Sequence, residues 1–276
     1  TVGLGSNVAL RVEGLKRDAN DYITPNYIVT EEHGDHAHST KERRVGNTFS
    51  ESENVNVGLS WIGERGFAGV SYSNRQDQYG LPGHSHEYES CHLHGLSLHC
   101  GGHDDDDHSG HDHGEEEHDH AEAGPWIDMK TERYDFRSEL NEPFTGFKKL
   151  RAQASYTDYQ HDEIEGSTAM TTFKSKGYEG RVELLHNPIA AWEGVWGVQA
   201  SQQKLDITGE EAVLAPNKTQ KYSVFGLEHR QFGDFHVELG TRFDHQTVDV
   251  DSAQKDFDGN AFSYSGAVNW AFAPNY

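Results

Sequence analysis

Residues 234–245, DFHVELGTRFDH, alternate at every step between two kinds of side chain. One set is Phe235, Val237, Leu239, Thr241 and Phe243, and the other is His236, Glu238, Gly240, Arg242 and Asp244. Successive side chains of a β-strand point to opposite faces of its sheet. This period of two therefore predicts a strand with one mainly apolar face and one charged face.

The same alternation returns along the whole chain. Clear examples are FSYSGAVNWAF (262–272), AWEGVWGVQAS (191–201), KLRAQASY (149–156) and NVNVGLSW (54–61). The pattern predicts ten strands, at residues 2–17, 53–62, 66–76, 126–140, 146–160, 171–186, 191–206, 219–231, 234–248 and 260–272.

The predicted connections alternate in length. Tight turns fall at IGERG (62–66), NEPFTG (141–146), NPIAA (187–191) and RQFGD (230–234), whereas longer polar links begin near Asp18, Gln76, His161, Ile207 and Asp249. Short turns on one side, long loops on the other and aromatic residues near the strand ends are typical of an antiparallel transmembrane β-barrel. A soluble β-sandwich is the alternative, but it would not set glutamate and arginine regularly opposite the apolar face on so many long strands. The sequence therefore favours an all-β barrel over residues 1–276.

Composition excludes other classes of protein. The formal net charge of -23 leaves no basic face for a nucleic-acid partner. Hydrophobic residues make up 34% of the chain, which is low for a soluble core of this size. The 29 glycines suit a chain whose apolar residues are spread thinly over its strands. No run of about 18 apolar residues exists, which excludes a transmembrane helix. No signal peptide is visible at Thr1, so we expect a mature or excised chain.

One segment has a very different composition. Residues 99–120, HCGGHDDDDHSGHDHGEEEHDH, hold seven histidines and nine acids, with no large apolar side chain to bury. They belong to a predicted loop at about 77–125, on the extracellular, long-loop side of the barrel. Its candidate metal ligands are His84, His86, His92, His94, His99, His103, His108, His111, His113, His118 and His120, together with Asp104, Asp105, Asp106 and Asp107.

This loop predicts capture of a divalent metal ion. Imidazole with carboxylate suits zinc, copper or nickel, and copper binds most tightly in the intrinsic order. Many pairs, such as His111 with His113, can reach one ion, so we expect several weak, exchanging sites. A solvated acidic tract is the alternative, yet it has no need of eleven histidines. An expression tag fits poorly with the internal position and the interleaved acids.

A smaller group with the same chemistry lies in the first long loop. EEHGDHAHS, residues 31–39, contains His33, His36 and His38 among acids, and we count these three histidines as candidate ligands too.

Two cysteines, Cys91 and Cys100, flank HLHGLSLH within the second loop. Thiols on a segment exported through an oxidising compartment most simply form a disulfide. Zinc ligation beside His92 and His99 is the rival interpretation.

The charged faces predict a polar barrel interior. Arg133, Asp135, Arg137, Glu139, Glu179, Arg181 and Glu183 are expected to point inward, most simply as charge pairs. Five residues at the strand ends on the long-loop side are expected to be polar groups of the barrel rim: His161, Asp162, Glu163, Asp244 and His245. His186 and His229 lie near short turns and are expected to have structural roles.

Three stretches resemble the barrel of TonB-dependent outer-membrane receptors: RYDFRSELNEPFTGFKKLRAQASYTDYQHDEIEG (133–166), KGYEGRVELLHNP (176–188) and FGLEHRQFGDFHVELGTRFDHQTV (225–248). The histidine-rich loop resembles that of their zinc-receptor branch. The resemblance implies a 22-strand barrel, an N-terminal plug and a segment that engages TonB. With about ten strands and neither of the other parts, this chain is expected to be a portion of such a barrel, without plug.

The resemblance implies zinc capture at the surface of a Gram-negative cell for import, with zinc as the bound or transported ion. Copper or nickel are the other candidate ions. The implied partners are a divalent metal ion, outer-membrane lipid and, for the full-length protein, the TonB complex. No catalytic arrangement emerges, so we expect no enzyme activity. Two alternatives stay open: a self-contained ten-strand barrel enzyme such as a protease, and a surface protein that only buffers metal.

Overall fold

The computed structural model describes residues 1–33, 36–82, 91–94, 97–100, 124–209, 212 and 214–273, and only the backbone of residues 29–33, 36–39, 91–94 and 97–100. Every regular element in these residues is a β-strand. Among them, no helix is long and apolar enough to cross a membrane.

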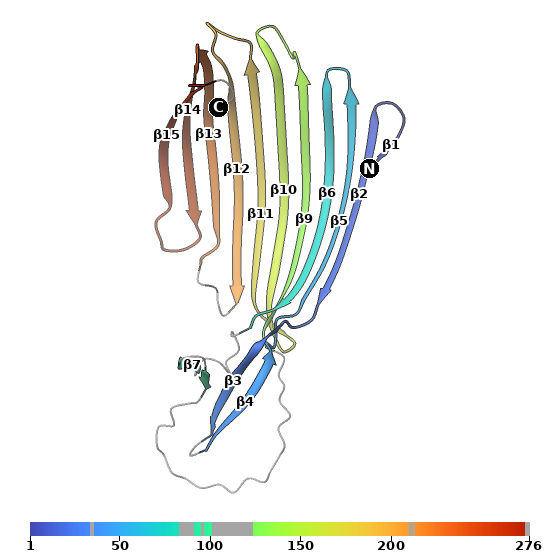
Figure 1. Cartoon of the computed structure of the whole chain (residues 1–276), viewed down its shortest axis with the longest axis vertical. Helices are drawn as coiled ribbons and strands as arrows, with labels where there is room; N and C mark the ends of the chain where they lie inside the picture. The colour runs from blue at the N-terminus through green and yellow to red at the C-terminus, as the bar shows by residue number, and fades with distance from the viewer. Residues whose placement is uncertain are drawn as a thin grey trace.

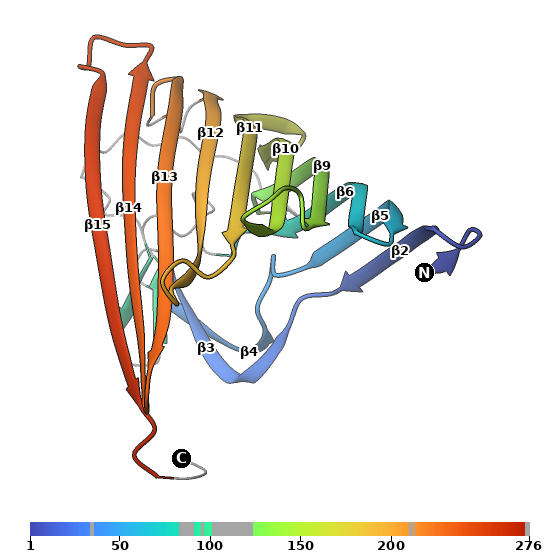
Figure 2. The same cartoon turned by 90° about the horizontal axis from the view of Figure 1, so that it is seen from above.

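The main body is an 11-stranded sheet in the order β1-β2-β5-β6-β9-β10-β11-β12-β13-β14-β15, with every neighbouring pair antiparallel. Its long strands stand side by side (Figure 1) and curve into an open arc when seen from above (Figure 2). The strands are β1 (Val2–Gly3), β2 (Val8–Ala19), β5 (Ser50–Gly63), β6 (Gly66–Gly80), β9 (Trp126–Asn141), β10 (Phe147–Glu165), β11 (Thr168–His186), β12 (Glu193–Gly209), β13 (Asn217–Phe232), β14 (Phe235–Val250) and β15 (Phe257–Trp270).

These strands confirm the predicted segments, with one change at the N-terminus. The segment expected at 2–17 divides into β1 and β2, because the chain reverses between them and the Leu4 amide donates to the Val8 carbonyl at 2.7 Å. The four predicted tight turns are also confirmed. In RQFGD, Phe232 pairs with Phe235 across a two-residue turn, and Gly233 there has a φ of 58°, which glycine adopts without a Cβ clash.

One predicted long link is wrong. The link expected to begin near His161 is a tight turn, because β10 continues to Glu165 and β11 starts at Thr168. Both faces of this end of the hairpin are largely polar, so the apolar alternation that marked the strands elsewhere is missing. The strands continue because backbone pairing does not require an apolar face.

The apolar side chains gather on one face of the main sheet. A single row of directly opposed residues runs Ala152, Val182, Val198, Val224 and Phe243 across β10 to β14. Val224 is 59% exposed, and within the described part of the chain only Ile127 and Ile207 are buried apolar residues. A soluble sandwich would cover such a face, whereas a barrel turns it to lipid. We call it the outward face, and the opposite one the lumen face.

A second sheet projects from the end of the main sheet where the long links lie (Figure 1). It has the order β4-β3-β8-β7, formed by β3 (Ile23–His33), β4 (His36–Arg44), β7 (Cys91–His94) and β8 (Ser97–Cys100). We call it the small sheet. These four strands lie in segments predicted to be loops, so the prediction is wrong for them.

Candidate functional site

The small sheet joins the two histidine-rich segments that the sequence placed in separate loops. β3 pairs with β8 in parallel, with Thr30 beside His99 and Glu31 beside Cys100. β3 also pairs with β4, and β8 with β7, both antiparallel. Residues near position 30 and near position 95 thus share one continuous backbone framework at the extracellular end.

The register of this sheet groups the candidate ligands in rows. In one row His38, Glu31, Cys100 and Cys91 lie directly opposite one another, and in the next row Ser39, Thr30, His99 and His92 do so. At the end of the β3–β4 hairpin His33 lies opposite His36. Rows two apart fall on the same face of a sheet, so the positions of His33, His36, His38 and Glu31 share a face.

Much of the predicted metal site lies outside the described residues. This applies to His84, His86, His103, His108, His111, His113, His118, His120, Asp104, Asp105, Asp106 and Asp107. The prediction that residues 99–120 belong to an irregular loop is wrong for His99 and Cys100, because both belong to β8. Among the residues whose side chains the structure describes, no group of three or more His, Cys, Asp or Glu is placed to hold a metal.

Two belts of aromatic residues mark the outward face of the main sheet. Tyr72, Tyr134, Tyr156 and Tyr178 lie directly opposite one another on β6, β9, β10 and β11, with ring centroids 4.9, 6.2 and 4.7 Å apart. At the short-turn end, Trp196 Nε1 donates a hydrogen bond of 2.7 Å to Glu228 Oε1. The Trp196 ring also packs against the His186 ring, with their centroids 5.0 Å apart. His186 is 2% exposed and also contacts Glu228, so it is structural, as predicted.

Such belts flank the apolar band of outer-membrane barrels at the two lipid interfaces. A family model described as "TonB dependent receptor-like, beta-barrel" matches residues 96–276, which is more than half of the chain. The chain belongs to this receptor family.

Solved structures with the same fold include three metal or siderophore transporters. The FrpB iron transporter from Neisseria meningitidis, as apoprotein, matches with a TM-score of 0.68 and 9% identity, over 98% of this chain and 40% of that one. The copper transporter OprC matches with a TM-score of 0.62 and 13% sequence identity, over 96% of this chain and 38% of that one. The ferric-catecholate import receptor Fiu from E. coli matches with a TM-score of 0.57 and 10% sequence identity, over 97% of this chain and 47% of that one. This receptor chain therefore spans less than half the length of these matches.

Family membership confirms the fold class and the location of this receptor chain. It is a β-barrel protein of the Gram-negative outer membrane. Receptors of this kind are not enzymes, so the alternative of a self-contained barrel protease is wrong.

The lumen face of the receptor carries charge pairs, as predicted. Arg133 makes two hydrogen bonds of 2.8 Å to Asp135, and Arg181 makes two to Glu183, of 2.8 and 2.5 Å. Arg151 makes one of 3.0 Å to Glu139. These pairs neutralise the wall locally, which is the ordinary structural role of a polar barrel interior.

An aromatic residue adds to this wall. Arg181 Cζ lies 4.2 Å from the centroid of the Phe225 ring, and Arg242 Cζ lies 5.6 Å from it. Gly197, directly opposite Phe225, leaves room for the ring, because a Cβ there would come within 2.1 Å of it.

Strand alternation divides the rim residues between the two faces of the main sheet. His161 lies on the lumen side, where it stacks on Phe173 at 4.3 Å, but Asp162 lies on the outward side and accepts from Thr172 at 2.6 Å. Likewise Asp244 pairs with Arg242 on the lumen side, whereas His245 lies in the outward row of Tyr222. Strand alternation separates each pair of neighbours, so these residues are polar rim groups.

Proposed function

We propose that this chain is the part of a TonB-dependent receptor that captures zinc at the cell surface for import. The single observation that carries the proposal is the parallel pairing of β3 with β8. It brings the segment with His33, His36 and His38 into one sheet with β7 and β8, from which the histidine-rich loop continues.

The backbone register of the β3–β4 hairpin brings the positions of four candidate ligands close together. Opposed residues of an antiparallel pair have Cα atoms about 4.5–5.5 Å apart, and positions two apart on a strand are about 7 Å apart. His33, His36, His38 and Glu31 occupy such positions on one face. Three imidazoles and one carboxylate are a donor set that zinc accepts in tetrahedral geometry.

The donor atoms of the second loop argue against copper(I) and against the hard oxygen-seeking cations. The segment between Gln78 and Trp126 contains no methionine, so it offers no thioether for Cu(I). Its many histidines are borderline ligands, which suit Zn²⁺ better than they suit the hard oxygen-seeking cations. Copper(II) binds the same groups, so supply and site geometry must decide between the two ions.

Metal accumulation by intact cells tests the function. Cells that carry the full receptor gene are expected to accumulate radioactive zinc, and cells that lack the gene or TonB are expected not to. Unlabelled copper or iron in equal amount is expected to reduce the zinc signal far less than unlabelled zinc does. Zinc accumulation that is the same with and without TonB would instead support a surface protein that only buffers metal. Stronger retention of copper or iron would contradict the choice of metal.

We further propose that Cys91 and Cys100 form a disulfide. They are directly opposite in the antiparallel β7–β8 pair, which places their Cα atoms about 4.5–5.5 Å apart. Disulfides bridge Cα separations of about 4.4–6.8 Å. A bridge here would close the β7–β8 hairpin while leaving the following histidines available.

Mass spectrometry without reductant is expected to find one peptide pair joined through Cys91 and Cys100. Replacement of Cys100 with serine should release a free thiol at Cys91, detected by alkylation. Two thiols that react freely and become protected on addition of zinc would favour metal ligation instead.

A further inference from the structure

Two histidines lie together at the short-turn end of the lumen face. His229 on β13 and His236 on β14 have ring centroids 5.3 Å apart, with an angle of 36° between the ring planes, and both are half-buried. They share the face of Phe225 and Arg242, because positions two apart on a strand point to the same side. The sequence alone indicates only a structural role for His229, because it cannot show that His236 lies beside it.

The distance between the two rings is that of imidazoles that share one metal ion. A Zn–N bond is about 2.0–2.1 Å long, so two rings on one tetrahedral ion have centroids about 5 Å apart. In the register His229 is opposite Glu238, and His236 lies two residues nearer the turn on the same strand as Glu238. Long or ring-shaped side chains at such diagonal positions reach each other across a strand pair.

A chain of hydrogen bonds orients the ring of His236. Gln231 Nε2 donates to the Gly233 carbonyl in the turn at 2.7 Å, so Gln231 Oε1 is the atom that meets His236 Nδ1, at 3.3 Å. An amide oxygen can only accept, which places the proton of the neutral ring on Nδ1 and the lone pair on Nε2. Histidines that bind metal ions usually have such a partner on their second nitrogen. The turn therefore holds His236 in the form that binds a metal through Nε2.

Two carboxylates flank the pair. His229 lies directly opposite Glu193 on β12 and Glu238 on β14. Glu193 accepts a hydrogen bond of 2.7 Å from Lys148 Nζ. The Glu238 carboxylate makes no hydrogen bond or ion pair within the described part of the chain. Its charge is therefore available to attract a cation to the two imidazoles.

We propose that His229 and His236 bind a divalent transition-metal ion in transit at the periplasmic end of the receptor. Short turns lie on the periplasmic side of such barrels. His236 is about 46 Å from Val250, at the long-link end of β14, at 3.3 Å per residue. Two imidazoles, with water in the other positions, hold an ion less firmly than the four side chains of a structural zinc site, which suits an ion that must leave. The inference rests on the proposed function only for the identity of the ion, zinc.

Copper binding by the full receptor in detergent tests the site. Cu²⁺ is the probe because it binds imidazole more tightly than the other first-row divalent ions do, and its electron paramagnetic resonance spectrum reports nitrogen ligands. The parent protein carries serine at every histidine of the two loops, namely His33, His36, His38 and the eleven from His84 to His120. It is expected to bind Cu²⁺ through two imidazole nitrogens, and H229Q/H236Q in the same parent is expected to lose this signal. Excess Zn²⁺ should displace the copper.

A variant of Gln231 tests the hydrogen bond that orients the ring. Q231L leaves both imidazoles in place, so the signal of two nitrogens should remain. Copper affinity is expected to fall about 10- to 100-fold, the usual cost of losing a partner of a ligating histidine. An unchanged affinity would contradict the role of Gln231 in positioning His236.

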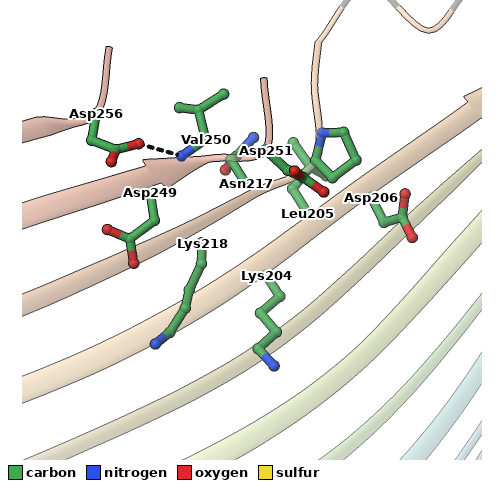
Figure 3. Close-up of a pocket in the computed structure, with 10 residues that line it drawn as sticks. Lys204, Leu205, Asp206, Asn217, Lys218, Asp249, Val250, Asp251 and Asp256 are labelled. Carbon is green, nitrogen blue, oxygen red and sulfur yellow. Dashed lines mark hydrogen bonds between the residues drawn. The ribbon is translucent and has the colours of Figure 1, made fainter. Parts of the chain in front are cut away.

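Matched carboxylate variants test the charge beside the pair. E193Q/E238Q is expected to weaken copper binding several-fold and to keep both nitrogens. Asp206 on β12 and Asp249 on β14 line a pocket at the long-link end of the same two strands, near Lys204 and Lys218 (Figure 3). D206N/D249N therefore removes two acids from the same strands at a distance from the pair and is expected to bind copper as the parent does.

Only folded barrels are compared, as judged by the heat-dependent shift in gel electrophoresis. A nitrogen signal of equal strength in H229Q/H236Q and its parent would overturn the proposal, because the two rings would then only pack against each other. Zinc uptake by cells, with no copper bound at the pair, would also overturn it and leave the proposed function standing. Copper bound at the pair, with no zinc uptake by cells, would support the site and show that the cargo is another divalent metal.

Discussion

Zinc binding is expected to fall to the level of the His33, His36 and His38 group and of the His229–His236 pair when the eleven histidines from His84 to His120 are replaced with serine. The wild-type chain should bind several zinc ions at about pH 7.5 and lose most of them by about pH 5.5, because imidazole binds metal only when neutral and its ordinary pKa is about 6.5. Neighbouring carboxylates favour protonated imidazole, which moves this competition upward in pH. Calorimetric titration of the detergent-solubilised chain with zinc measures both effects.

The matched control separates the contribution of the acids from that of the histidines. Replacing Asp104, Asp105, Asp106 and Asp107 with asparagine should weaken zinc binding and leave its pH dependence in place. Carboxylates alone would keep their charge down to about pH 4 and would prefer calcium or magnesium. Zinc binding that persists in the chain without these eleven histidines, above the level of the His33, His36 and His38 group and the His229–His236 pair, would rule out capture by the loop.

The second large effect is expected on the outward face of the main sheet. Ala152 on β10 is the first residue of the apolar row, with Ser138 on β9 and Val182 on β11 directly opposite it. An arginine there would face the hydrocarbon of the bilayer, at a cost of about 2–4 kcal/mol at the midplane. The variant A152R should therefore fold into lipid vesicles with an equilibrium constant roughly 30- to 700-fold lower, measured by urea titration of the heat-dependent gel shift.

A residue three positions away on the same strand provides the control. Ser155 lies on the lumen face, directly opposite Asp135 on β9 and Glu179 on β11. The variant S155R places the same side chain between two acids and should fold as well as the wild type. If S155R cost as much as A152R, or if A152R cost nothing, the assignment of the two faces would be wrong.

Local alternation was enough to predict the ten long strands and the side that faces lipid. In residues such as Val182 and Glu183, neighbours in sequence differ because one meets hydrocarbon and the other meets the polar lumen. The prediction failed where that difference ends. Beyond the membrane both faces of the β10–β11 hairpin meet water or polar neighbours, so Gln160 to Glu165 showed no alternation although they are strand.

The metal-binding composition was likewise predictable, but its arrangement was not. A density of histidine and acid is a local property of residues 31–39 and 84–120. The pairing of Val29 with Leu98 and of Thr30 with His99 joins residues about 70 positions apart in a parallel register. Backbone hydrogen bonds of such a pair can form at many registers, and no residue type near position 30 or 98 specifies this one.

By itself, then, the sequence determined an antiparallel barrel with a lipid face and a charged lumen face, because these depend on which side chains follow one another along a strand. It also determined which loops are rich in histidine and acid, because composition is a local property. The tertiary structure alone decided that the two histidine-rich segments share one sheet and that His229 and His236 lie together beside Glu238. Those placements depend on the register between strands, and register is set by turn lengths and by the packing of whole faces rather than by any local run of residues.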